Sequence, residues 1–377
     1  MEFIDLKAQY AALREEIDAG INKVLTSTHF ILGEEEQEFE EKLAEYIGVK
    51  HVIGCSNGTD ALQLIYMAYG IGKGDAVFCP DMTFIASVEP ACLLGAEPIF
   101  CDIDPKTYNI AADSLERQVN AVIKEGRLTP KAVVAVDFIG NPADYSAIRE
   151  ITQKYNLLLI EDAAQGTGAS VNGVKCGALG DIAATSFFPS KPLGCYGDGG
   201  AVYTNDDGMD QLLRSIRVHG KGKSKYDNQR IGMNARLDTM QAAIMLPKLK
   251  VLDQEISIRQ TIAARYDQAF KNILQIPYVM EGMVSAYAQY ALLAKDTEQR
   301  DHIMSELKAH NIPTLVYYPV PLHKMKVFEG CFMGEETFEN TVAYADRTFS
   351  LPFSAYLKEE DQEKVIDVVC AAVISRE

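Results

Sequence analysis

Basic residues are scarce in this 377-residue sequence, which has 36 Lys and Arg against 53 Asp and Glu. The formal charge of −17 opposes binding to nucleic acid, because that binding depends largely on basic side chains that neutralise phosphate. Long apolar runs are missing as well, and none approaches the roughly 18 residues that a membrane span requires. We therefore predict a soluble protein that binds neither nucleic acid nor membrane.

Two further features are missing, a signal peptide and paired cysteines. The first residues, "MEFIDLKAQYAALREEIDAG", carry acids and helical periodicity, whereas a signal peptide has a basic start and a continuous apolar stretch. The eight cysteines form no C-x-x-C pair, and several lie in apolar segments such as "AVFCP". This pattern favours buried free thiols in a reducing cytoplasm and predicts no metal site.

The chain is longer than a single hydrophobic core usually allows, and its pattern of helical and strand-like segments changes near residue 248. Before that point, apolar strand-like segments alternate with helical ones, which predicts an α/β domain with a mostly parallel sheet between two helical layers over residues 1–248. After Arg236 a long helical stretch extends to about residue 270 and leads to strands in "AYAQYALLA" and "IPTLVYYP". We predict a small α+β domain over residues 249–377.

Ligands of open α/β sheets bind beyond the carboxyl ends of the strands, so residues just past each strand are candidates for the site. In "SNGTDAL", small residues precede a helix whose free amides and dipole could bind a phosphate, although such turns are usually only caps. In "LLLIEDAAQGTGAS", Asp162 ends an apolar strand. It is either the N-cap of a following helix or a buried carboxylate that holds a proton on a heteroaromatic nitrogen.

The third candidate is Lys191 in "TSFFPSKPLGCYGDGGA", a lysine among apolar, small and glycine residues. Burial would lower its pKa and make the neutral amine available as a Schiff-base nucleophile and proton carrier. A phosphate cradle, a strand-end acid and a lysine in this order together indicate one cofactor, pyridoxal 5′-phosphate (PLP).

Motifs along nearly the whole chain resemble the DegT/DnrJ/EryC1/StrS family of nucleotide-sugar aminotransferases. They are, in order, "SNGTDAL", "PDMTFIAS", "IEDAAQGTGA", "TSFFPSKPLGCYGDGGA", "GMNARLDTMQAA" and "YYPVPLH". The resemblance implies the PLP-dependent aspartate aminotransferase fold (fold type I). Within the family, "EFIDLK", "NGTDALQ" and the lysine motif are most similar to enzymes that aminate the 3-oxo group of UDP-2-acetamido-2-deoxy-3-oxo-D-glucuronate for bacterial surface polysaccharide, with L-glutamate as the expected donor.

The resemblance also assigns cofactor-binding residues. It implies that Lys191 forms the Schiff base with PLP and that Asp162 pairs with the pyridinium nitrogen. Gln165 would lie beside the ring hydroxyl and Phe84 would stack on the ring, although a helix-cap glutamine and a core phenylalanine are the alternatives. The expected phosphate ligands are Gly58, Thr59, Ser186 and, from the partner subunit, Asn234, which implies a homodimer with shared active sites.

Four further residues match family positions near the substrate, namely Arg236, Tyr317, Tyr318 and His323. Arg236 could receive a uronate carboxylate, although an arginine here is general in the family. Tyr317 replaces the histidine of many members, and a structural role is the alternative for His323.

Other functions would require different sequence features. A nucleotide-sugar reductase or epimerase would need G-x-G-x-x-G after the first strand, and "GIGKGD" at Gly70 follows a helix instead. The PLP-dependent sugar dehydratases resemble this family but have histidine in place of Lys191. An aminotransferase for another UDP- or dTDP-linked 3-oxo or 4-oxo sugar and a PLP-binding regulator are the remaining alternatives. The basic segment 218–230 is either a solvated loop or an electropositive rim for a phosphorylated ligand.

Overall fold

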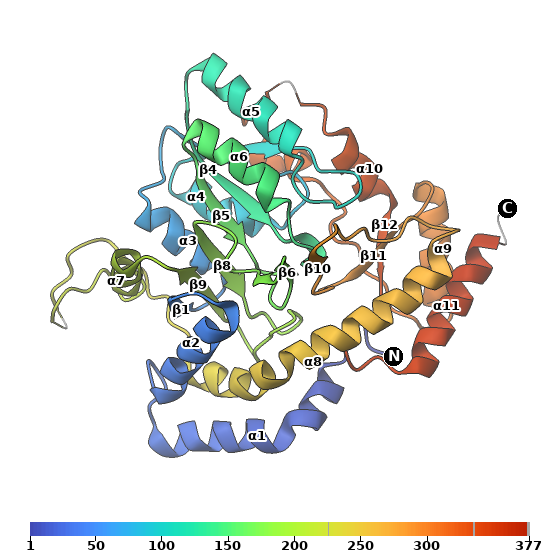
Figure 1. Cartoon of the computed structure of the whole chain (residues 1–377), viewed down its shortest axis with the longest axis horizontal. Coiled ribbons are helices and arrows are strands. Elements are labelled where there is room, and N and C mark those ends of the chain that lie inside the picture. The colour runs from blue at the N-terminus through green and yellow to red at the C-terminus, as the bar shows by residue number, and fades with distance from the viewer. Residues whose placement is uncertain (225, 335, 375–377) are drawn as a thin grey trace.

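The computed structural model describes residues 1–224, 226–334 and 336–374, and its centre is a seven-stranded sheet with the order β1-β9-β8-β5-β4-β2-β3 (Figure 1). Strands β8, β5, β4, β2 and β3 are parallel, and β9 runs antiparallel to both of its neighbours. The sheet is thus mostly parallel, as predicted. Its strands are β1 (His51–Cys55), β2 (Asp75–Pro80), β3 (Glu97–Cys101), β4 (Thr129–Val136), β5 (Leu158–Asp162), β8 (Ile182–Ser186) and β9 (Gly200–Thr204).

Helices connect these strands, and several begin at a capping residue. Asn57, Asp144, Asp206 and Asp296 each accept a hydrogen bond from the amide three residues on, which satisfies a free N–H of the first turn. The α-helices are α1 (Leu6–Ser27), α2 (Glu34–Ile47), α3 (Gly58–Ala68), α4 (Glu89–Leu93), α5 (Ala112–Glu125), α6 (Tyr145–Tyr155), α7 (Asp207–Ile216), α8 (Thr239–Phe270), α9 (Thr297–Ala309), α10 (Glu339–Arg347) and α11 (Glu359–Ile374).

Both faces of the sheet are buried, because alternate residues of the strands pack into separate cores. In β4, Val134 and Val136 join the core beneath α3, α4 and α7, whereas Val133 and Ala135 join the core beneath α5 and α6. Near β1 and β9, helices α2 and α8 cover the same face of the sheet as α5 and α6. The layers are therefore α/β/α, in agreement with the prediction for the first part of the chain.

A smaller unit forms around β11 (Tyr290–Leu293) and β12 (Thr348–Leu351), which pair antiparallel. The end of α8, together with α9 and α11, packs on these strands in a core of their own. Helix α8 runs without interruption from the main sheet to this unit (Figure 1). The proposed boundary at residue 248 thus falls inside a helix, and the small-unit core begins further along it, at Ile262.

The predicted strand in "AYAQYALLA" is confirmed as β11, but the one in "IPTLVYYP" is wrong. Residues 312–319 contain only an isolated bridge between Leu315 and Ser350. Proline cannot donate a ladder hydrogen bond, and Pro313 and Pro319 bracket this segment. Further short strands are β6 (Ser170–Val171), β7 (Val174–Lys175) and β10 (Met283–Val284), which form a separate three-stranded sheet.

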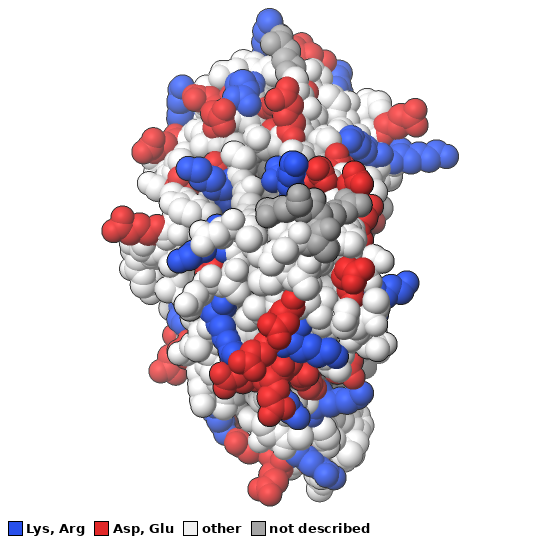
Figure 2. Space-filling model, turned by 90° about the vertical axis from the view of Figure 1, so that its right-hand side faces the viewer, with Lys and Arg blue, Asp and Glu red and all other residues white. Residues whose placement is uncertain are grey.

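The cysteines are free, and five of the eight are buried. Among the described residues, the longer helices are too polar to cross a membrane. On the face shown in Figure 2, acidic side chains gather in the lower part with basic ones beside them. Arg265 of α8 forms two ion pairs with α11, one with Glu359 at 2.9 Å and one with Glu363 at 3.0 Å.

Candidate active site

A cavity of about 590 Å³ opens at the carboxyl edge of the sheet. Strands β5 and β8 end there and are parallel, so Asp162 and Ser186 reach the same edge. Helix α3, which follows β1, begins at the same place with Gly58. The candidate residues that line the cavity are Gly58, Thr59, Phe84, Asp162, Gln165, Ser186, Lys191, Tyr317 and Tyr318. The fold thus brings together most of the residues selected from the sequence.

Lys191 lies in the turn after β8, where its amide donates to the carbonyl of Phe188 at 2.8 Å. Its side chain lines the cavity and is half-buried. Burial lowers the pKa of Lys191 to about 8, and the nearby Asp162 carboxylate opposes this shift. A substantial fraction of the amine is therefore neutral near physiological pH, as a nucleophile or proton acceptor requires.

Asp162 is buried and is held by two hydrogen bonds. Its Oδ2 accepts from Ser87 Oγ at 2.8 Å, and its Oδ1 accepts from the Ala164 amide at 3.1 Å. Burial raises the pKa of the carboxyl group, whereas these donors and the charge of Lys191 lower it. Residues 164–168 form turns rather than a helix, so Asp162 is no helix N-cap.

The start of α3 offers free donors to a ligand. The amides of Gly58 and Thr59 have no acceptor within the described part of the chain, while the Asp60 amide is capped by Asn57 at 2.8 Å. A Cβ on Gly58 would lie 2.8 Å from Ser186 Cβ, so glycine allows α3 and β8 to meet closely. Free amides at a helix N-terminus beside a hydroxyl form a suitable site for a phosphate.

Gln165 and Phe84 both approach Tyr318. Gln165 accepts from the Ile139 amide, in the short 3-10 helix Phe138–Gly140, at 2.5 Å and donates to Tyr318 Oη at 3.3 Å, so its side chain caps no α-helix. Phe84 is 55% exposed, which excludes a core role within this chain, and its ring centroid lies 5.9 Å from that of Tyr318. Burial raises the pKa of Tyr318, which keeps this hydroxyl protonated.

Three predicted residues lie outside the cavity of their own chain. Asn234 is exposed and forms an isolated bridge with Val218, and Arg236 lies two residues further. His323 Nδ1 contacts Asp81 Oδ2 at 2.5 Å, and its ring stacks on Phe338. In the basic segment 218–230, Lys221 and Lys223 do not line the cavity either. Lys225 lies outside the described residues.

Sequence reasoning missed several polar residues that line the cavity, among them Thr83, Ser87 and Gln289. Thr83 and Ser87 flank the predicted Phe84, and their hydroxyls lie 2.8 Å apart. Gln289 is 3% exposed, and its Oε1 has no hydrogen-bond partner within the described chain. A glutamine inside the otherwise apolar "AYAQYALLA" was the available signal, since a buried amide without a partner is costly.

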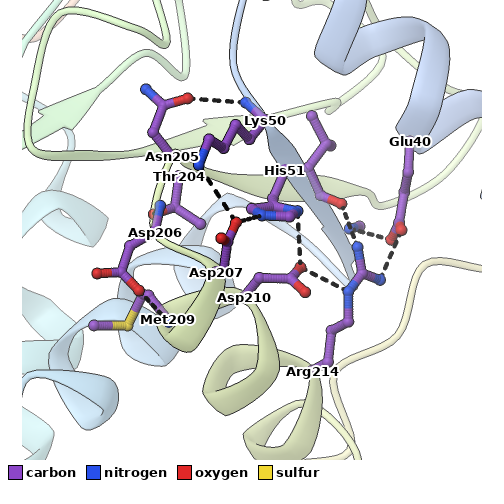
Figure 3. A network of polar contacts seen from close by, with 12 residues as sticks. Glu40, Lys50, His51, Thr204, Asn205, Asp206, Asp207, Met209, Asp210 and Arg214 are labelled. Carbon is purple, nitrogen blue, oxygen red and sulfur yellow. Dashed lines mark hydrogen bonds and ion pairs between the residues drawn. The ribbon is translucent and has the colours of Figure 1, made fainter.

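A second cavity, of about 430 Å³, lies between α2, β1 and α7. Its charged groups are largely paired with one another (Figure 3). Arg214 contacts Glu40 and Asp210 at 2.8 and 2.7 Å, and His51 Nε2 lies 2.8 Å from Asp207. This network attaches the two helices to the edge of the sheet, and we assign it a structural role.

One group of possible metal ligands occurs among the described residues, formed by Asp137, Glu161 and Cys176. The Glu161 carboxylate already accepts hydrogen bonds from three backbone amides, those of Gly177, Leu179 and Gly180. Burial raises the pKa of Asp137 well above its ordinary value, and the neighbouring Glu161 adds to this. Burial raises the pKa of Glu161 as well, so two buried carboxyl groups held by hydrogen bonds account for the group without a metal.

The residues of the larger cavity fit PLP. The amides at the start of α3 suit its phosphate, Lys191 suits its aldehyde, and the buried carboxylate of Asp162 suits its ring nitrogen. Gln289 Oε1 also lacks a partner in the absence of a ligand. The donor set therefore matches the chemistry of the three polar ends of this molecule.

Comparison with known proteins gives a consistent result. Residues 11–370 match the model of the DegT/DnrJ/EryC1/StrS aminotransferase family. UDP-2-acetamido-2-deoxy-3-oxo-D-glucuronate aminotransferase of Pseudomonas aeruginosa is 43% identical, with 99% of each chain covered. A pleiotropic regulatory protein of Geobacillus stearothermophilus is 40% identical over 97% of this chain and 96% of its own length.

A solved structure is more similar still. The crystal structure of a DegT DnrJ EryC1 StrS aminotransferase from Brucella abortus superimposes with a TM-score of 0.97. It is 47% identical in sequence, and the alignment covers 99% of each chain.

Proposed function

Because the chain belongs to the DegT/DnrJ/EryC1/StrS aminotransferase family, we propose that it aminates the 3-oxo carbon of UDP-2-acetamido-2-deoxy-3-oxo-D-glucuronate, with L-glutamate as the donor. It is a PLP-dependent sugar aminotransferase of fold type I. The finer assignment is supported by the Pseudomonas aeruginosa relative, which is named for this substrate. The product would serve bacterial surface polysaccharide, such as O-antigen, and the reaction would take place in the cytoplasm.

The observation that carries the proposal is a half-buried lysine that shares the cavity with a buried carboxylate and a helix N-terminus. When bound, PLP supplies an electron sink and carries the amino group from donor to acceptor. The free amides of Gly58 and Thr59, with Ser186, would hold its phosphate, and Asp162 would keep its ring nitrogen protonated. Phe84 and Gln165 would orient the ring.

Lys191 then has two tasks within the cavity. Its neutral amine would hold the cofactor between turnovers and, once displaced by the donor, would take a proton from the donor α-carbon and pass it to the cofactor. In the second half-reaction the same amine would carry a proton in the opposite direction, from the cofactor to the carbon that receives the amino group. A lysine whose pKa is lowered to about 8 can both accept and return this proton near neutral pH.

Arg236, Tyr317, Tyr318 and His323 were predicted near the substrate, and Asn234 near the cofactor phosphate. Tyr317 and Tyr318 line the cavity and can contact the sugar from the same chain. Asn234 and Arg236 lie outside it, which supports their placement in the partner subunit's site of a homodimer. His323, engaged with Asp81 and Phe338, would act on the substrate only through the loop that it holds.

The test is a comparison of kcat/KM with glutamate and a panel of UDP- and dTDP-linked 3-oxo and 4-oxo sugars. We expect the UDP-linked 3-oxo uronate to be the preferred acceptor. If Arg236 binds its carboxylate, Arg236→Ala should raise KM for this sugar about tenfold to hundredfold and spare the glutamate half-reaction, because a hydrogen bond to a charged group contributes about 1.5–3 kcal/mol. Preference for a neutral 4-oxo sugar would overturn the assignment.

A regulatory role is the second candidate, because the Geobacillus stearothermophilus relative carries the name of a regulatory protein. It predicts cofactor binding without turnover of any sugar in the panel. The absorbance change of the glutamate half-reaction separates the two, since only an aminotransferase needs it.

A further inference from the structure

The buried side of Asp162 is in contact with a hydroxyl pair from the turn after β2. Ser87 Oγ donates to Asp162 Oδ2 at 2.8 Å, and Thr83 Oγ1 lies 2.8 Å from Ser87 Oγ. Ser87 and Thr83 are 1% and 3% exposed, so water cannot easily replace either contact. The backbone of Ser87 is fixed as well, because its carbonyl accepts from Tyr66 Oη at 2.6 Å.

The direction of these hydrogen bonds follows from the number of hydrogens. An ionised carboxylate only accepts, so the single hydroxyl hydrogen of Ser87 is directed to Asp162. Thr83 must then donate to Ser87, which orders the two hydroxyls in series. Hydrogen bonds in such a series polarise one another and favour the charged form of the acceptor at its end.

We propose that Ser87 is a positioning residue that, together with Thr83, orients the Asp162 carboxylate and keeps it ionised. Among the described residues, Ser87 is the only side chain that donates to Asp162, and the Ala164 amide is the other donor. The inference rests on the role of Asp162 in the proposed function, since an ionised Asp162 is what a protonated ring nitrogen requires. The motif "PDMTFIAS" alone does not show that its serine supports Asp162.

The charges around Asp162 make the proposal measurable. Burial opposes ionisation of Asp162, and the Ser87 hydrogen bond is the largest effect in the opposite direction. Lys191 is the cation that faces it. The other titratable groups that interact with Asp162 are Tyr66, Cys79 and Tyr318, and burial raises the pKa of each, which keeps them neutral. Loss of the Asp162 charge should therefore lower the pKa of Lys191.

The experiment measures the pH dependence of Lys191 acylation in the full-length protein freed of cofactor, by mass spectrometry of the lysine peptide. Ser87→Ala should shift the midpoint of labelling to lower pH by about half a unit or more. Thr83→Val, which keeps the shape but removes the hydroxyl, should shift it in the same direction. Thr83→Ser keeps the hydroxyl and should retain the wild-type midpoint.

A second readout uses the cofactor-loaded enzyme. The acid limb of the glutamate half-reaction, followed in single turnovers, should move to higher pH by about one unit in Ser87→Ala, because a hydrogen bond to a charged group of about 1.5 kcal/mol corresponds to that shift. Unchanged midpoints in folded Ser87→Ala and Thr83→Val proteins would overturn the proposal. If sugar amination is absent but the labelling midpoint shifts, the proposed function fails while the role of Ser87 stands, because labelling needs neither cofactor nor sugar.

Discussion

Lys191 and Asp162 depend on each other for their charge. Burial favours the neutral form of both, and the attraction between them favours the charged form of both. Ser87 and the Ala164 amide add to the stability of the carboxylate but not to that of the ammonium. On balance the pKa of Asp162 is raised, because burial outweighs these donors, and the pKa of Lys191 is lowered to about 8. Amino transfer needs the ionised form of Asp162, so the hydrogen bonds that the carboxylate accepts are essential to the site.

Replacing Asp162 tests this balance. Asp162→Asn removes the charge with little change in shape, and we expect the glutamate half-reaction to slow by orders of magnitude, because the ring nitrogen loses the anion that keeps it protonated. Single-turnover absorbance measures the rate. The exposed Asp301, replaced by Asn, is the matched control and should have no effect. A wild-type rate in Asp162→Asn would show that this residue serves only the structure of the turn.

At the residue scale, sequence reasoning located Lys191, Asp162 and Gly58 because each follows a recognisable strand and lies in a family motif. Ser87 was missed because its partner is 75 residues away, and no local pattern connects them. Gln289 did leave a local signal, a polar residue in an apolar strand, but its importance comes from the cavity that it lines, which the sequence alone does not show. Contacts made across the sheet edge depend on packing, which a single sequence does not specify.

At the scale of elements, the cavity depends on how closely β9 approaches the start of α3. A Cβ on Gly200, the first residue of β9, would lie 2.4 Å from the carbonyl carbon of Asn57, a distance that no side chain can tolerate without backbone movement. This glycine therefore positions the amides that we assign to the phosphate.

Gly200→Ala should both destabilise the protein and weaken cofactor binding. We expect a loss of about 1–3 kcal/mol in the free energy of unfolding, as is typical of overpacking, and a higher Kd for PLP. Gly208→Ala, in the first turn of α7, meets only the end of the Asp206 side chain at 3.2 Å and should remain within about 1 kcal/mol of wild type. Equal PLP affinity for the two variants would show that β9 does not set the phosphate site.

The elements themselves were predictable to different degrees. The apolar strands of the main sheet and the long helix α8 were identified because their patterns are continuous. The erroneous strand at residues 312–319 has an apolar composition, but it contains prolines and forms a single bridge to Ser350. Within the described part of the chain, β12 therefore has β11 as its only full partner. The position of the domain boundary was harder to predict, because α8 contributes to both cores.

At the scale of the whole molecule, Asn234 and Arg236 were predicted to serve the site but do not line the cavity of their own chain. We propose that these residues complete the site of a second copy. A homodimer would also cover exposed apolar side chains such as Phe30 and Ile231.

Mixed dimers test this arrangement. A Lys191→Ala chain and an Asn234→Ala, Arg236→Ala chain, coexpressed with different tags, should form heterodimers with one damaged site and one intact site. Activity per heterodimer should return to about half that of wild type, while each parent homodimer stays inactive. No recovery in heterodimers of confirmed composition would refute a shared site.

The most direct test of the account is the chemical identity of the residue that carries the cofactor. Borohydride reduction of the PLP-loaded protein, followed by peptide mass spectrometry, fixes the cofactor to the amine that holds it. We predict a phosphopyridoxyl group on Lys191 and none in the Lys191→Ala protein. Modification of another lysine, or of none, in the wild-type protein would contradict the central claim.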